Sequence, residues 1–228
     1  MGHARSLSGL TSMQIHTISM GLSQAYLIEH YCGLMIVDAG LPGSESKVID
    51  LFHKLKRDDL KLIFISHAHL DHYGSAAALR RLTGAKIAIH HADEDAMAHG
   101  KTILGSVHGR GRLVKSILPL METYFKPEPT PADILLEDGD ILGIDGLQGN
   151  VLHTPGHTPG SSCLVIQGGF AFVGDLISSN GKPHVQPYFA QDWSNIPISM
   201  KKLQAVKPNR VYPGHGNHPI DEESLQRL

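Results

Sequence analysis

The sequence has few cysteines, no long apolar run and no excess of charge of one sign. Its two cysteines, Cys32 and Cys163, lie far apart in apolar stretches, which indicates reduced, packed thiols rather than a disulfide framework. No stretch approaches the roughly 20 apolar residues that a membrane-spanning helix needs. The first residues also lack an apolar run long enough for a secretory signal. These absences predict a cytoplasmic protein.

The charges nearly balance, with 20 Lys and Arg residues against 22 Asp and Glu residues and a formal net charge of -2. Such a chain lacks the positive field that draws a protein onto DNA, RNA or anionic lipid. We therefore expect a small-molecule substrate and neither a nucleic-acid nor a membrane partner. The composition leaves the oligomeric state open.

A chain of 228 residues, 41% hydrophobic and 18% charged, can bury one sizeable core. We expect residues 1-12 to form a flexible N-terminal lead and residues 13-228 to form a single domain. Apolar or alternating runs predict strands over 13-19, 24-30, 34-38, 62-66, 86-90, 134-136, 140-144, 148-153, 162-166, 170-173 and 210-212. Helical patterns lie near 45-55, 73-82, 92-98 and 194-206. Strands and helices alternate in both halves, which predicts an α/β (α+β) fold with helices outside packed sheets.

Two long segments, 100-131 and 177-193, show neither pattern clearly, and the first mixes helix with glycine- and proline-rich loop. Segments of this length in a compact domain are usually functional or disordered, so both are candidates for the walls of a substrate pocket. The first carries Arg110, Arg112 and Lys115, which could receive an anionic substrate group. A solvated basic helix face explains them more simply. At the start of the helix near 45-55, Ser44 can cap the first turn.

Sixteen histidines are the one unusual value of the composition, and four metal-competent side chains lie within six residues: His67, His69, Asp71 and His72. They follow a predicted buried strand. In extended chain the first two can point the same way, whereas the last two lie where the chain turns into a helix and can face a second point. Imidazole and carboxylate without thiolate suit zinc, with iron, manganese or cobalt as alternatives, and are typical of catalytic sites.

Three later metal-competent residues also follow predicted strands: His157, Asp175 and His215. The motif His-x-His-x-Asp-His at 67-72, followed by these three in this order, resembles the metallo-β-lactamase superfamily. The resemblance covers nearly the whole chain. It implies a four-layer αββα sandwich with the site along one edge of the two sheets.

The resemblance also implies a binuclear site with two divalent metal ions. One ion would be bound by His67, His69 and His157. The other would be bound by Asp71, His72 and His215, and Asp175 would bridge the two together with a water. Asp38, in IVDAG, matches a strand-end aspartate that supports the site from behind, although a turn-forming Asp explains it equally well.

Two divalent ions, two aspartates and a bridging hydroxide leave such a centre near a charge of about +1, which makes hydroxide available near neutral pH and stabilises an oxyanion. We therefore expect a hydroxide held with Asp71 and Asp175 to attack an ester, thioester or lactone carbonyl. No protein nucleophile is required. Ser161, Ser162 and Cys163 lie close to His157 in sequence, but their turn lacks the nucleophile-elbow pattern.

Differences from branches of the superfamily narrow the expectation. Enzymes that hydrolyse β-lactams usually have cysteine or serine where this chain has Asp175, so a β-lactamase is less favoured. Hydroxyacylglutathione hydrolases and quorum-signal lactonases share the ligand set, but the former have a helical C-terminal region where only a short tail follows His215 here. A mononuclear iron sulfur oxygenase, similar to persulfide dioxygenases, is the alternative from another class. A metal-binding protein without activity is a third. Tyr188 could donate to the oxyanion, although packing explains it more simply.

Overall fold

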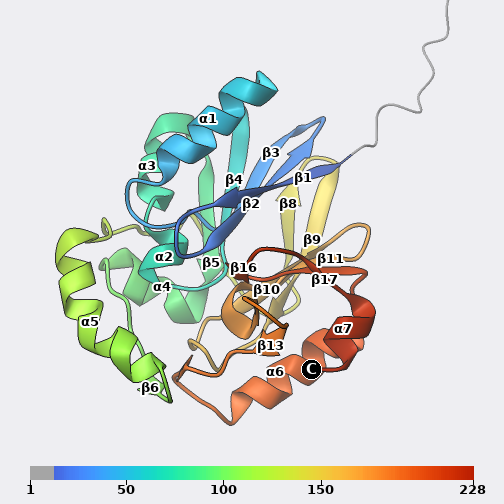
Figure 1. The fold of residues 1–228 in the computed structure, drawn as a ribbon. Helices are drawn as coiled ribbons and strands as arrows, with labels where there is room; N and C mark the ends of the chain where they lie inside the picture. The colour runs from blue at the N-terminus through green and yellow to red at the C-terminus, as the bar shows by residue number, and fades with distance from the viewer. Residues whose placement is uncertain (1–12) are drawn as a thin grey trace, which may run out of the picture.

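A computed structural model describes residues 13-228; the expected N-terminal lead, 1-12, lies outside the described residues. Two six-stranded sheets pack face to face, and helices cover the outer face of each (Figure 1). The first sheet has the order β1-β2-β3-β4-β5-β7. Its strands are β1 (Gln14–Ser19), β2 (Gln24–His30), β3 (Gly33–Val37), β4 (Leu60–Ile65), β5 (Lys86–His90) and β7 (Ile134–Leu136). The strands from β3 onward are parallel.

The second sheet has the order β17-β15-β11-β10-β9-β8. Its strands are β8 (Ile141–Ile144), β9 (Leu147–His153), β10 (Ser162–Ile166), β11 (Phe170–Phe172), β15 (Arg210–Tyr212) and β17 (Ile220–Asp221). The helices α1 (Glu45–Leu55), α3 (Ala76–Thr83) and α4 (His91–Ala98) accompany the first sheet, and α6 (Asn195–Val206) and α7 (Glu222–Gln226) accompany the second. The predicted αββα sandwich is confirmed.

The apolar strand sequences follow from burial on both faces of each sheet. In β4, Ile63 and Ile65 pack against the helices outside the first sheet, whereas Leu62 and Phe64 pack between the sheets. Neighbouring side chains of a strand point to opposite faces, so one continuous apolar run contributes to two cores. A third core lies between the second sheet and α6, where Leu203 is fully buried.

Two local predictions change in the structure. Ser44 stands at the N-cap of α1, but its hydroxyl makes no capping hydrogen bond, so the predicted cap is wrong. Its backbone N–H donates instead to Ser75 Oγ, at 2.9 Å, because the helix starts against the α3 turn. The helix predicted near 73-82 is divided into α2 (Leu70–Tyr73) and α3, with a break at Gly74. A Cβ at Gly74 would lie 2.4 Å from Pro42, so the break lets two chain segments approach closely.

The segments without a clear pattern contain short elements. The first contains β6 (Ser106–Val107) and the helix α5 (Gly111–Tyr124). The second contains β12 (Ile177–Ser179), β13 (His184–Val185) and β14 (Phe189–Ala190). β6 pairs with β14, so the two segments meet in space. Among the helices of residues 13-228, none has the length and apolar character needed to span a bilayer.

Candidate metal centre

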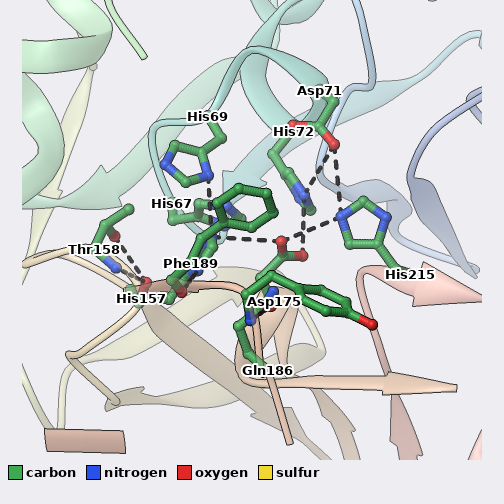
Figure 2. Close-up of polar contacts among 12 residues, drawn as sticks. His67, His69, Asp71, His72, His157, Thr158, Asp175, Gln186, Phe189 and His215 are labelled. Carbon is green, nitrogen blue, oxygen red and sulfur yellow. Dashed lines mark hydrogen bonds and ion pairs between the residues drawn. The ribbon is translucent and has the colours of Figure 1, made fainter. Parts of the chain in front are cut away.

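The seven residues predicted to bind metal converge at one edge of the sandwich (Figure 2). Each comes from the chain that follows a strand. The turn after β4 carries His67 and His69, and α2 carries Asp71 and His72. The other three follow β9, β11 and β15: His157, Asp175 in the single-turn helix η2 (Gly174–Leu176), and His215 in β16 (His215–Gly216). Strand ends packed in a core hold these side chains in fixed positions.

The ligand atoms form two groups, in each of which they lie within 4.8 Å of one another. One group contains His67, His69, His157 and Asp175, and the other contains Asp71, His72 and His215. The carboxylate of Asp175 faces both, since Oδ2 lies 3.4 Å from His157 Nε2 and 3.1 Å from His215 Nε2, and Oδ1 lies 3.2 Å from His72 Nε2 (Figure 2). This is the division that the resemblance implied, with Asp175 between the two groups.

The nitrogen that each of the five histidines turns away from the centre has a hydrogen-bond partner. Three of these outer nitrogens donate to backbone carbonyls: His69 Nε2 to Ile103 at 3.3 Å, His157 Nδ1 to Phe189 at 2.9 Å, and His215 Nδ1 to Leu22 at 2.8 Å. The other two donate to side chains: His67 Nδ1 to Ser66 Oγ at 3.0 Å and His72 Nδ1 to Asp38 Oδ2 at 2.8 Å. A proton on the outer nitrogen leaves a lone pair on the inner one, as a metal ligand requires.

The nitrogen and oxygen atoms that face the centre are suited to binding a cation. Without a cation, several of them lack a favourable polar contact. His67 Nε2 is buried and has no hydrogen-bond partner. His72 Nε2 and Asp175 Oδ1 are also buried without a hydrogen bond, although they lie 3.2 Å apart as an ion pair. His69 Nδ1 and His157 Nε2 lie only 3.0 Å apart. Since both of these rings donate from the other nitrogen, two lone pairs face each other. Buried polar atoms without partners are costly, so this donor set fits bound metal ions.

The electrostatics differ between the two groups. Burial lowers the pKa of His67 well below its ordinary value and lowers the pKa of His157 to about 4, so these rings are neutral at pH 7. Burial also lowers the pKa of His215, but Asp175 and Asp71 outweigh it and raise that pKa to about 9. Burial raises the pKa of Asp175, yet His215 and His72 hold it well below the usual range. Without metal, the second group is therefore a set of ion pairs.

Asp38 supports the centre from behind, as one of its two predicted roles required. Its carboxylate accepts from His72 Nδ1 and from the backbone N–H and hydroxyl of Ser66, at 2.8, 2.8 and 2.9 Å. The Ser66 hydroxyl in turn accepts from His67, so one buried carboxylate orients a histidine in each group. Asp38 has a φ of 60°, a left-handed conformation that costs free energy in a non-glycine residue and is often found at functional sites.

Asp93 is a supporting residue that the sequence did not reveal. It is only 3% exposed, and it accepts from the backbone N–H of Ala68 at 2.8 Å and of Gly160 at 2.6 Å and from Thr158 Oγ1 at 2.7 Å. Ala68 lies between two histidine ligands, and Thr158 follows His157. Asp93 therefore joins the two ligand-bearing turns. In the sequence it resembles an ordinary charged residue of a short helix.

The two segments without a clear sequence pattern reach the edge of the centre, and their role as walls of a substrate pocket stays a prediction. The carbonyls of Ile103 and Phe189, one from each segment, orient His69 and His157. Nearby, His108 stacks on Trp193 with 4.3 Å between ring centroids, and Tyr188 makes an edge contact with Phe189. The packing expected for Tyr188 is thus present. Ile103 and Phe189 thus orient two histidines of the candidate centre.

The hydroxyl and thiol groups near His157 are poor nucleophiles. Ser162 Oγ donates to the carbonyl of Gly160 at 2.9 Å, and Ser161 Oγ lies 2.7 Å from Thr158 Oγ1. Burial raises the pKa of the Cys163 thiol to about 12, so the reactive thiolate is absent at neutral pH. Cys163 and Cys32 are both free, as predicted.

A family model described as the metallo-beta-lactamase superfamily matches residues 19–215. The chain is 27% identical over 176 residues to human acyl-coenzyme A thioesterase MBLAC2, which covers 73% of this chain and 60% of that protein. It is 28% identical over 147 residues to hydroxyacylglutathione hydrolase GloC of Haemophilus influenzae, which covers 64% of this chain and 62% of that protein. The chain thus spans less than two thirds of the length of both relatives.

Among solved structures, the fold is similar to that of the B3 metallo-beta-lactamase BLEG-1. The TM-score is 0.73 at 22% sequence identity, over 94% of this chain and 97% of that chain. At this identity the likeness extends to the fold alone.

Proposed function

The chain belongs to the metallo-β-lactamase superfamily, and we propose that it is a metal-dependent hydrolase that cleaves a thioester, an ester or a lactone. The observation that carries the proposal is the convergence of seven side chains with metal-binding chemistry in two adjacent groups, three of whose inner atoms, His67 Nε2, His72 Nε2 and Asp175 Oδ1, are buried without a hydrogen-bond partner. Such a set suits divalent cations and leaves coordination positions open for water and substrate.

A thioester is the substrate class we favour. Both curated relatives described above carry names of thioester hydrolases, one for acyl-coenzyme A and one for hydroxyacylglutathione. A lactone or simple ester stays open, because the same centre attacks any activated carbonyl and the walls choose among them. A β-lactam is disfavoured, since Asp175 occupies a position where β-lactamases usually have cysteine or serine.

We propose two zinc ions as the cofactor, with iron or manganese as alternatives. The first would be held by His67, His69 and His157, the second by Asp71, His72 and His215, and Asp175 would contact both. When bound, such ions lower the pKa of a water molecule to near neutrality and polarise a carbonyl. The protein contributes orientation: Asp38, the Ser66 hydroxyl and three backbone carbonyls accept from the outer imidazole nitrogens and keep them protonated, and the buried strand ends fix the positions.

The alternative from another class is a sulfur oxygenase with a single iron. The group formed by His67, His69, His157 and Asp175 would be enough to bind one iron. In that case the second group, which includes His215, would bind no metal. Cytoplasmic location and a small-molecule substrate stay predictions from the sequence.

Metal analysis paired with a substrate panel tests the proposal. We expect about two equivalents of metal per chain, about one after His215→Ala, and turnover of a thioester above that of a lactone or an aryl ester. Saturation at one equivalent, unchanged by His215→Ala and accompanied by oxygen consumption with a persulfide, would favour the mononuclear iron alternative.

A further inference from the structure

The helix α5 turns apolar side chains toward solvent. It lies at the edge of the molecule, away from both sheets (Figure 1). Large apolar residues are exposed in and beside it: Ile103, Leu113, Val114, Ile117, Leu120, Tyr124 and Phe125. Leu113 is 68% exposed and Tyr124 is 79% exposed. Helices of globular proteins usually bury their apolar face against the core. The apolar face of α5 is instead exposed to solvent.

Four large apolar side chains of α5 share one face of the helix. Leu113, Ile117, Leu120 and Tyr124 are three or four residues apart and share one face of a helix. Pro119 and Thr123 lie to one side of that face and line a cavity of about 550 Å³, together with Thr102 and Ile103. Gly111 at the helix start contacts Tyr188, where a Cβ would come within 2.7 Å of the carbonyl oxygen. Among the described residues of α5 only Gly111 and Leu118 are not exposed. Both lie on the side opposite the apolar face, so the helix meets the protein there and turns the apolar face outward.

The same segment concentrates positive charge. Residues 100-126 contain five of the 20 Lys and Arg residues and one of the 22 Asp and Glu residues, so the segment carries +4 while the rest of the chain carries -6. The five cations are exposed: Lys101, Arg110, Arg112, Lys115 and Lys126. No acidic side chain that the structure describes forms an ion pair with any of them. The near-neutral total charge conceals this patch.

A second copy of the chain is a poor cover for this face. The 14 residues of α5 make a helix about 21 Å long and about 10 Å wide, so its face amounts to a few hundred Å². A stable interface needs about 800 Å² from each partner. In a dimer formed through this face, two segments that each carry a net charge of +4 would also repel each other. A surface that is both apolar and anionic fits better.

We propose that α5 docks the protein on an anionic lipid bilayer. The apolar face enters the boundary between headgroups and acyl chains, and the flanking cations contact lipid phosphates, as interfacial amphipathic helices do. Docking places the wall of the metal centre at the bilayer, since Ile103 of the same segment contacts His69 at 3.3 Å. The proposal rests on the exposed apolar face of α5 and the positive charge of residues 100-126. It does not depend on which reaction the metal centre catalyses.

Co-sedimentation of the metal-loaded full chain with vesicles tests the docking. We expect binding to phosphatidylcholine mixed with phosphatidylglycerol and weak binding to phosphatidylcholine alone. Leu120→Glu should lower the partition coefficient about tenfold or more. Leu82→Glu is the matched control, because Leu82 on α3 has the same 62% exposure as Leu120, and it should leave binding unchanged.

The charge contribution is tested separately. Arg110→Gln and Arg112→Gln should each lower binding to the anionic vesicles about fivefold, whereas Lys54→Gln and Lys201→Gln, also exposed, should not. Circular dichroism and metal content confirm that each variant is folded. Absence of vesicle binding by the wild type, or equal loss with Leu82→Glu, would overturn the proposal. So would a dimer that Leu120→Glu dissociates in the absence of lipid binding.

Discussion

The metal centre and the segment 100-126 that walls it are built in opposite ways. In the centre, His67 and His72 are at most 1% exposed, and every histidine ligand is oriented by a second hydrogen bond. The wall segment contacts the remainder through the two-residue pair β6-β14 and a few side chains, and its helix is largely exposed. Under the proposed function, the rigid region is the one that would carry the reaction, and the exposed segment is the one that would contact a partner or substrate.

The two regions nevertheless meet at defined atoms. Ile103 and Phe189 supply carbonyls to ligand histidines, whereas α5 makes no such contact. Changes in the centre should therefore affect reaction rate, and changes in α5 should affect selection or location. The predictions below test that division, from the largest expected effect to the smallest.

Asp175→Asn should have the largest effect. The change keeps the shape of the side chain and removes the negative charge that faces His72, His157 and His215. We expect kcat/KM to fall on the order of a hundredfold or more, with a much smaller change in the free energy of unfolding. Steady-state kinetics and urea unfolding of the metal-loaded enzyme measure the two. Activity within a few-fold of the wild type would contradict the assigned role.

Asp93→Asn should have the next largest effect. Both carboxylate oxygens of Asp93 accept hydrogen bonds, whereas asparagine has an NH₂ group in place of one oxygen, and that group would face a donor. The turns carrying Ala68 and Thr158 should loosen, and kcat/KM should fall about tenfold to a hundredfold with weaker metal retention against a chelator. Asp95→Asn is the control, since Asp95 lies on the same helix with 80% of its side chain exposed. Lower stability with unchanged metal affinity would mean that Asp93 has only a structural role.

Replacement of 110-124 by a short Gly/Ser link should change selection rather than the centre. The cut spares Ile103 and β6, which contact the ligand-bearing elements, so metal content should be unchanged. The ratio of kcat/KM between a thioester and a lactone should change by about tenfold, since discrimination arises from contacts away from the metals. An equal fall for a thioester, a lactone and an aryl ester, or no change in any, would show that this segment does not set specificity.

The smallest effect concerns His90, outside both regions. Burial, with His153 and His91, lowers the pKa of His90 to about 4. Between that value and the ordinary value of 6.5, the unfolded chain binds a proton that the folded chain does not. Stability from this residue is therefore complete above pH 6.5 and is lost as the pH falls toward 4.

His90→Asn should make the fall in unfolding free energy with acidification shallower by about 1–2 kcal/mol, a discounted figure because His153 and His91 titrate over the same range. Asparagine can still accept a hydrogen bond at this N-cap. Urea unfolding at several pH values measures the slope, and activity at neutral pH should be unchanged. Parallel stability curves for the wild type and His90→Asn would contradict the prediction.

Local patterns were enough for the longer strands, since β4 and β5 follow from apolar runs that differ from the surrounding turns. They did not reveal short strands such as β6, β12 and β14, whose pairing depends on segments far apart in the chain. The seven ligand candidates also followed from local sequence, because each combines a metal-competent residue with a strand end. Asp93 could not be found in this way. An aspartate in a short helix has the same sequence signature whether it is exposed or accepts three buried hydrogen bonds, and only the approach of the 157-161 turn distinguishes them.

The sequence by itself predicted the alternation of strands and helices, because central strands such as β3 and β4 are continuous apolar runs, and it showed which residues can bind metal, because few side chains have the chemistry. The four-layer arrangement was implied by the family resemblance. Only the tertiary structure decided how those residues divide, that Asp175 faces both groups, and that Asp38 and Asp93 orient them. It also decided that α5 turns its apolar face outward. These outcomes depend on contacts between segments far apart in the chain, and a one-dimensional pattern contains periodicity but not the distance between such segments.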